Sequence, residues 1–122
     1  MADKPTIVVA TNNPGKLKEF ALLLPNFKII SQSSLNISPE EEVGETFFEN
    51  TLQKARVANN ASGMVSLGDD SGLIVPALNN LPGLRSARYA HENATDEENR
   101  QYLRKELEAL DLNQTKAYIV CV

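Results

Sequence analysis

Cysteine, histidine and tryptophan are scarce in this sequence of 122 residues, and each shortage excludes a class of site. There is one cysteine, Cys121, one histidine, His91, and no tryptophan. A single cysteine forms no intrachain disulfide and fits a reducing compartment. Because no second histidine or cysteine stands at ligand spacing from His91, a zinc site is not expected. Cys121 stands among apolar residues and is predicted to be a small buried side chain.

Long apolar runs and an excess of basic residues are also missing. The net charge is −4, from 12 Lys and Arg against 16 Asp and Glu, which disfavours a nucleic-acid binder. No segment is long enough to span a membrane, and the first residues lack the apolar stretch of a signal peptide. We therefore expect a cytoplasmic protein without a membrane or nucleic-acid partner. With 42% hydrophobic residues, residues 1–122 are predicted to form a single domain.

Short apolar runs alternate with stretches of helical periodicity along the chain. Strands are predicted at residues 6–10, 27–30, 64–67, 73–78 and 116–122, and helices at 16–24, 46–62 and 95–110. Two of these helices begin with a capping-box pattern, Thr46 with Glu49 and Thr95 with Glu98. In the helix after Thr46, Phe48, Leu52 and Ala55 are expected to share one face. This pattern predicts an α/β fold, a mixed twisted β-sheet flanked by helices with a substrate cleft.

A polar turn follows the first predicted strand and leads into a helix. Its residues are Thr11, Asn12, Asn13, Pro14, Gly15 and Lys16. The free N–H groups and the positive dipole end of a helix N-terminus favour an anion, and Lys16 adds a full charge. The spacing is not that of a Walker loop. An ordinary strand-to-helix turn with a solvated lysine is the alternative interpretation.

Two groups of acidic residues are candidates for binding a divalent cation. Asp69 and Asp70 stand between glycines at the end of a predicted strand, where α/β proteins place their sites. Mg²⁺ prefers one or two carboxylates together with waters and substrate phosphates. The alternative is an Asp-rich turn held by its own hydrogen bonds. The run of residues 40–42, three glutamates, is more typical of a solvated loop, although it could reach a metal shared with Asp70.

Four segments in order give the chain a resemblance to a known family. They are residues 9–16, 41–50 with 54–56, 69–73, and 82–83 with 86–89. Together they resemble the inosine/xanthosine triphosphate pyrophosphatases, which clear aberrant purine nucleotides. The resemblance covers nearly the whole chain. It implies Mg²⁺-dependent hydrolysis of ITP, dITP and XTP to the monophosphate and pyrophosphate, with attack at the α-phosphate, and it implies a homodimer.

The resemblance also implies roles for particular residues. Those binding the triphosphate are Thr11, Asn12, Asn13, Pro14, Gly15 and Lys16, and Ser71 contacts the substrate. Asp70 is implied as the general base and as a metal ligand, with Asp69 supporting the metal site. Glu41 is implied as the metal ligand from the acidic run. Glu42 is the alternative, because the register of such a run is uncertain by one residue.

The chain departs from the family at its C-terminal side. The family continues past Val122 with an aromatic Phe-Gly-Tyr-Asp-like segment and a Ser-His-Arg motif that grip the base, so the C-terminal part of the family fold is missing. One alternative is therefore a catalytically silent fragment that binds metal and triphosphate or associates with itself through an open sheet edge. Another is a metal-dependent nucleotide hydrolase that prefers pyrimidines.

Overall fold

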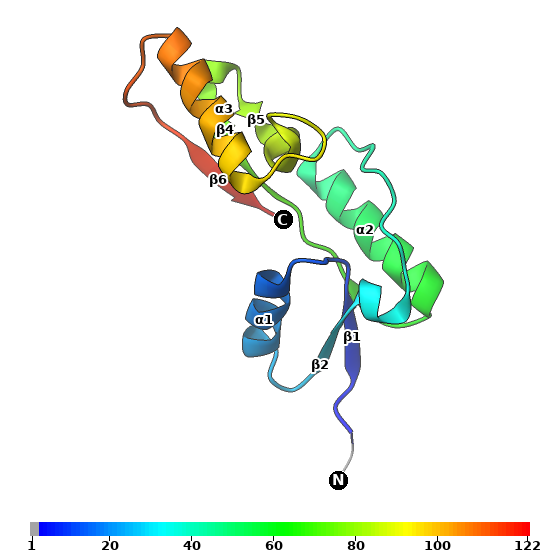
Figure 1. The fold of residues 1–122 in the computed structure, drawn as a ribbon. Helices are drawn as coiled ribbons and strands as arrows, with labels where there is room; N and C mark the ends of the chain where they lie inside the picture. Colours follow the sequence, from blue (N-terminus) through cyan, green and yellow to red (C-terminus); the bar gives the residue numbers. More distant parts are fainter. Residues whose placement is uncertain (1–2) are drawn as a thin grey trace. The chain divides into compact units, whose positions relative to one another are not determined.

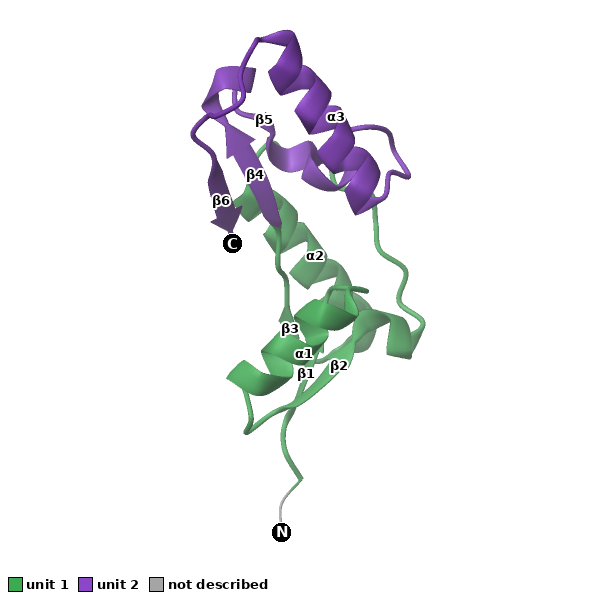
Figure 2. Ribbon diagram, turned by 60° about the vertical axis from the view of Figure 1, so that its left-hand side comes forward, with its two compact units in different colours: residues 1–70 green, residues 71–122 purple. Residues whose placement is uncertain are grey.

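The computed structural model describes residues 3–122, which divide into two compact units. Unit 1 is Met1–Asp70 and unit 2 is Ser71–Val122 (Figure 2). Strands and helices alternate along the chain, and both parallel and antiparallel pairings occur (Figure 1). The predicted α/β class is confirmed, with the two kinds of pairing in separate sheets, one in each unit. Within residues 3–122, no helix is both long and apolar enough to cross a membrane.

Unit 1 is built on a parallel three-stranded sheet of order β2-β1-β3. The central strand is β1 (Thr6–Val9), which pairs with β2 (Lys28–Ser31) and β3 (Ser66–Leu67). Central parallel strands are covered on both faces and therefore read as continuous apolar runs, and Val8 and Val9 are fully buried. Because parallel strands end at the same edge, the residues following β1 and β3 leave the sheet side by side.

Two α-helices and one short 3₁₀-helix, η1 (Gln32–Leu35), complete unit 1. Helix α1 (Pro14–Leu23) begins two residues earlier than predicted. The Asn13 side chain caps it by accepting from the backbone N–H groups of Gly15 at 2.9 Å and Lys16 at 3.4 Å. Helix α2 (Phe47–Ser62) runs from the predicted cap to a left-handed glycine. Only half of its predicted capping box forms, because the Glu49 carboxylate accepts from the backbone of Glu45.

The residues predicted to share one face of α2 differ in burial: Phe48 is 63% exposed, whereas Leu52 and Ala55 are half-buried. The most buried positions of the helix are Asn50, at 2%, and Ala58, at 0%. The reason is a close approach of the helix to the chain leaving β3. A Cβ atom on Gly68 would lie 2.3 Å from the Thr51 carbonyl oxygen, so the backbones meet there without side chains between them.

Unit 2 contains an antiparallel sheet of order β5-β4-β6 and one long helix. Its strands are β4 (Ser71–Val75), β5 (Leu81–Pro82) and β6 (Tyr118–Cys121), and its helices are η2 (Pro76–Leu78), η3 (Gly83–Arg88) and α3 (Asp96–Ala109). The capping box predicted at Thr95 forms in full at the start of α3. The prediction that Cys121 is buried is wrong, because β6 is an edge strand and leaves it exposed.

Candidate active site

The turn after β1 is organised by its own side chains. Asn13 donates its backbone N–H to Thr11 Oγ1 at 3.1 Å, and its carboxamide oxygen accepts the first amides of α1. These amides are the ones that a bound anion uses at a helix N-terminus. A phosphate at this turn therefore competes with Asn13 for them, and its charge is met chiefly by Lys16.

Two lysines and three carboxylates meet beside this turn, all within unit 1. Lys16 pairs with the Asp69 carboxylate. Lys54 Nζ lies 2.8 Å from Glu42 Oε1, 3.2 Å from Asp70 Oδ1 and 3.2 Å from the Asp69 carbonyl oxygen. Lys54 was not among the predicted site residues. Its position four residues after Asn50, and so on the same face of α2, is the signal that could have indicated it.

Burial makes these charges interact strongly. Asp69 and Asp70 are each 8% exposed. Burial lowers the pKa of Lys54, but the hydrogen bonds and charges of Glu42 and Asp70 raise it by more, so the pKa lies above 10.5. Lys54 is therefore a cation at neutral pH. Asp70 Oδ2 is buried and has no hydrogen-bond partner among residues 3–122. Leaving such an oxygen without a partner costs at least about 1–3 kcal/mol, which a ligand at this position would offset.

Among the three glutamates, Glu42 is the one that faces the aspartates through Lys54. Glu41 is exposed, and its backbone carbonyl accepts a hydrogen bond from Gln53 Nε2 at 2.7 Å. The alternation of side chains along an extended loop explains why neighbouring glutamates differ. The geometry thus favours Glu42, the alternative, over Glu41 as a metal ligand.

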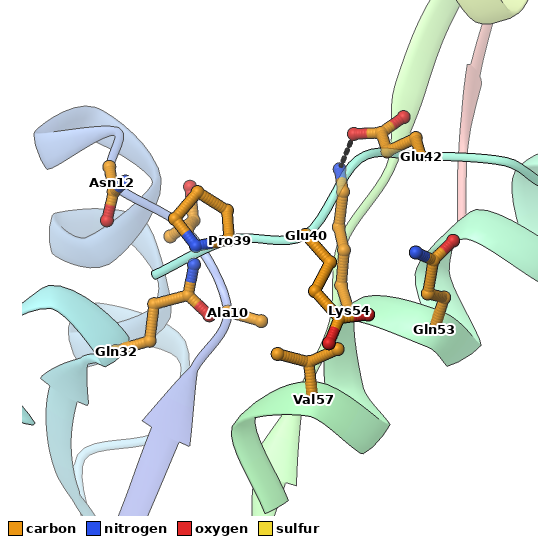
Figure 3. Close-up of a pocket in the computed structure, with 10 residues that line it drawn as sticks. Ala10, Asn12, Gln32, Pro39, Glu40, Glu42, Gln53, Lys54 and Val57 are labelled. Carbon is orange, nitrogen blue, oxygen red and sulfur yellow. Dashed lines mark ion pairs between the residues drawn. The ribbon is translucent and has the colours of Figure 1, made fainter. Parts of the chain in front are cut away.

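A cavity of about 190 Å³ in unit 1 lies between the turn and the loop that carries Glu40 and Glu42, and Lys16, Asp69 and Asp70 are not among the residues that line it. Figure 3 shows the Lys54 ammonium directed at Glu42, with Asn12 on the opposite wall. Its lining residues are Ala10, Thr11, Asn12, Gln32, Pro39, Glu40, Glu42, Gln53, Lys54 and Val57. Asn13, Pro14 and Gly15 shape the turn without lining this cavity.

The remaining candidate, Ser71, and two arginines lie in unit 2. Ser71 opens β4 directly after Asp70 in the chain, and its register partner is Cys121. Arg85 and Arg88 have a local partner, since both lie within 4 Å of the Glu92 carboxylate, at 3.8 and 3.9 Å.

The residues present suit a magnesium ion better than a metal held by protein alone. No group of three or more His, Cys, Asp or Glu side chains in residues 3–122 is placed to hold a metal. Mg²⁺ instead uses one or two carboxylates and fills its remaining positions with water and phosphate oxygens. Glu42 and Asp70, which share one cation, and the buried Asp70 Oδ2 provide that kind of partial site.

Comparison with known proteins identifies the family of the chain and supports its fold. The sequence profile of the Ham1 family matches residues 7–122. The chain belongs to the Ham1 family. The dITP/XTP pyrophosphatase of Haemophilus influenzae is 48% identical over 122 residues, which are 98% of this chain and 63% of that protein. The protein of the same name from Legionella pneumophila is 47% identical over 115 residues, covering 94% of this chain and 59% of its own length.

Solved Ham1 structures share the fold. The HAM1 protein of Coxiella burnetii superimposes with a TM-score of 0.87 at 43% identity, over 97% of this chain and 61% of that one. The Staphylococcus aureus Ham1 protein gives 0.80 at 42% identity, over 95% and 60%. This Ham1-family chain therefore spans less than two thirds of the length of these relatives.

Proposed function

We propose that this chain takes part in the hydrolysis of nonstandard purine nucleoside triphosphates such as dITP, XTP and ITP, giving the monophosphate and pyrophosphate. The relatives named dITP/XTP pyrophosphatase support the substrate class. The observation that carries the proposal is the cluster in unit 1. There, two lysines pair with three carboxylates next to the carboxyl ends of parallel strands, and Glu42 and Lys54 of this cluster also line a cavity.

In this proposal the lysines bind and orient the triphosphate. Lys16, at the first turn of α1, meets one end of the phosphate chain, and Asn12 donates a hydrogen bond from the turn. Lys54 remains charged because its pKa is raised, so it neutralises negative charge near Glu42 and Asp70 at the pH of a cell. Fixed charges in a partly buried site contribute more than they do in water, which is how such a site lowers the barrier.

Asp70 acts as the general base. Its Oδ2, buried and without a hydrogen-bond partner among residues 3–122, takes a proton from a water molecule. The water oxygen forms a bond to the α-phosphorus, the bond between this phosphorus and the α–β bridging oxygen breaks, and pyrophosphate leaves with the electron pair. Asp69 holds Lys16 in place through its ion pair.

Glu42 and Asp70 are the residues that would hold Mg²⁺. When bound, the ion supplies charge that neutralises the phosphate oxygens as the bond breaks. The adjacent Glu41 serves as a matched comparison. Glu42→Gln should raise the Mg²⁺ concentration for half-maximal activity by about ten- to a hundredfold, while Glu41→Gln changes it little. The reverse result would assign the ligand to Glu41.

The test is pyrophosphate release from dITP and XTP against dATP, with Mg²⁺, for the chain and for Asp70→Asn. We expect faster release from dITP and XTP, and a fall of about a hundred- to ten-thousandfold in the variant. Equal rates for all three nucleotides would remove the substrate assignment. An undiminished rate in Asp70→Asn would remove Asp70 as the base.

A second candidate is a chain that binds metal and triphosphate without turnover. The ion pairs of Lys16 and Lys54 supply charges that binding alone would use. Calorimetry with a non-hydrolysable triphosphate separates the two: binding without pyrophosphate release supports the silent chain. The homodimer also remains a proposal, and sedimentation velocity of the chain tests it.

A further inference from the structure

Side chains of α2 hold the acidic loop, which we define as residues 41–44, at its backbone. Asn50 Oδ1 accepts the Gly44 N–H at 2.8 Å. Gln53 makes two bonds, donating from Nε2 to the Glu41 carbonyl at 2.7 Å and accepting from the Val43 N–H at 3.3 Å. Glu42, the carboxylate that faces Asp70 through Lys54, lies between these attachment points.

The Asn50 contact is buried and closely fitted. Asn50 is 2% exposed and is among the largest fully buried side chains of the described residues. A Cβ atom on Gly44 would lie 2.4 Å from Asn50 Oδ1, which is closer than any side chain allows. The loop therefore approaches α2 at a glycine, and the hydrogen bond is shielded from water. Exchange with solvent is slow for such a bond.

The same helix carries the second acidic segment. Gly68 lies against the backbone of Thr51, and Lys54 donates to the Asp69 carbonyl. Thus Asn50 holds the loop that carries Glu42, and the next turn of α2 holds the segment that carries Asp70. The separation of Glu42 from Asp70 is fixed by where each segment is attached to this helix.

We propose that Asn50 is a positioning residue that holds the acidic loop so that Glu42 and Asp70 face one divalent cation. Asn50 acts through the backbone of Gly44, whose N–H its side chain accepts. The inference deepens the proposed function and rests on it for the metal. It assigns Asn50 a role distinct from packing, because loss of the Gly44 bond releases the loop and costs metal affinity.

Asn59 provides a matched control on the same helix. Its side chain also bonds a backbone group, donating from Nδ2 to the Met64 carbonyl at 2.8 Å, but this contact is at the far end of α2 from the acidic loop. Asn50→Leu and Asn59→Leu therefore both remove one asparagine hydrogen bond from α2. Only the first removes an attachment of the acidic loop.

The experiment uses the whole chain without nucleotide. Mn²⁺ affinity is measured by electron paramagnetic resonance, and the exchange rate of the Gly44 amide by NMR on ¹⁵N-labelled protein. Asn50→Leu should weaken Mn²⁺ binding by about ten- to a hundredfold, the usual loss when a residue behind the ligands is changed. Its Gly44 amide should exchange about fivefold faster or more. Asn59→Leu should keep both values while lowering the melting temperature.

A less buried variant keeps the inference testable where Asn50→Leu fails to fold. Gln53→Met removes the bonds to Glu41 and Val43 and should weaken Mn²⁺ binding by about three- to tenfold. Unchanged Mn²⁺ affinity in the folded variants overturns the inference. An equal loss in Asn59→Leu also overturns it, because the effect would then follow stability alone. Absence of Mn²⁺ binding in the wild-type chain overturns it as well.

Failure here is distinct from failure of the proposed function. Mn²⁺ affinity and amide exchange are measured without nucleotide or turnover, whereas the proposed function is judged by pyrophosphate release. An active enzyme whose Mn²⁺ affinity is indifferent to Asn50 removes only the positioning role. A chain without turnover whose Mn²⁺ affinity depends on Asn50 removes only the hydrolysis.

Discussion

Replacing Lys54 with methionine should destabilise unit 1 in a way that depends on pH. The substitution keeps most of the side-chain volume and removes the ammonium that lies between Glu42 and Asp70. At neutral pH this leaves two carboxylates facing each other without the cation between them. Removing one partner of a buried ion pair costs about 3–5 kcal/mol, whereas exposed pairs are worth about 0.2–1 kcal/mol.

The exposed fractions of the three side chains place the expected cost between that of a buried and that of an exposed ion pair. The side chains of Lys54, Glu42 and Asp70 are 25%, 21% and 11% exposed. We therefore expect a loss of about 2–3 kcal/mol in the free energy of unfolding at pH 7. With a urea slope of about 1.5 kcal/mol/M, the midpoint falls by about 1.3–2 M. Urea titration followed by far-UV circular dichroism measures it.

An alkaline pH window tests the electrostatic cause. Because the pKa of Lys54 is raised, the stabilisation by its ammonium is complete below pH 10.5 and is lost as the pH rises through the folded-state value. The deficit of the variant should therefore shrink at strongly alkaline pH. Lys18→Met, at an exposed position of α1, is the control. A deficit that is equal at pH 7 and at strongly alkaline pH, or below about 1 kcal/mol, would refute the reasoning.

Three further predictions follow from local contacts. Gly68→Ala should lower the free energy of unfolding by about 1–3 kcal/mol or more in urea titration, because its Cβ would meet the Thr51 carbonyl; an unchanged midpoint would contradict the close approach. Asn13→Ala should cost about 0.5–2 kcal/mol in the same assay by uncapping α1, with Asn13→Ser recovering part of the loss. The hydrogen bonds of Glu98 to His91 and Thr95 lower the pKa of its carboxyl, so this stabilisation of α3 is present above pH 4.5 and is lost as the pH falls further. Helicity measured by circular dichroism should then fall less between pH 6 and 3 in Glu98→Gln than in the wild type.

Local sequence signals predicted most of the elements because their causes are local. The cap at Thr95 and the left-handed glycine after α2 depend on residues within one turn of each helix end. β1 was recognised because a buried central strand is apolar on both faces. The strand β5 was not predicted, because its two residues are too few to show an apolar periodicity. It is a strand because it pairs with β4.

The sequence pointed to the polar groups of this cluster but not to the contacts between them. The turn at Lys16 and the pair Asp69–Asp70 stood out because each is next to a strand end, and the structure brings Lys16 and Asp69 together. The choice between Glu41 and Glu42 depends on how α2 holds the loop, and Lys54 belongs to the site only because of what packs against its helix. Hydrophobic periodicity does not mark Asn50 as a buried residue of α2, because its side chain is polar.

The spacing between Asn50 and Lys54 also limits which insertions this helix can accept. Each residue of an α-helix turns the following side chains by about 100°. One residue added between these two positions would therefore leave the acidic loop attached and rotate the ammonium away from both carboxylates. Within the Ham1 family we expect this stretch of α2 to vary in composition while its length stays constant, and gaps in related sequences to fall outside it.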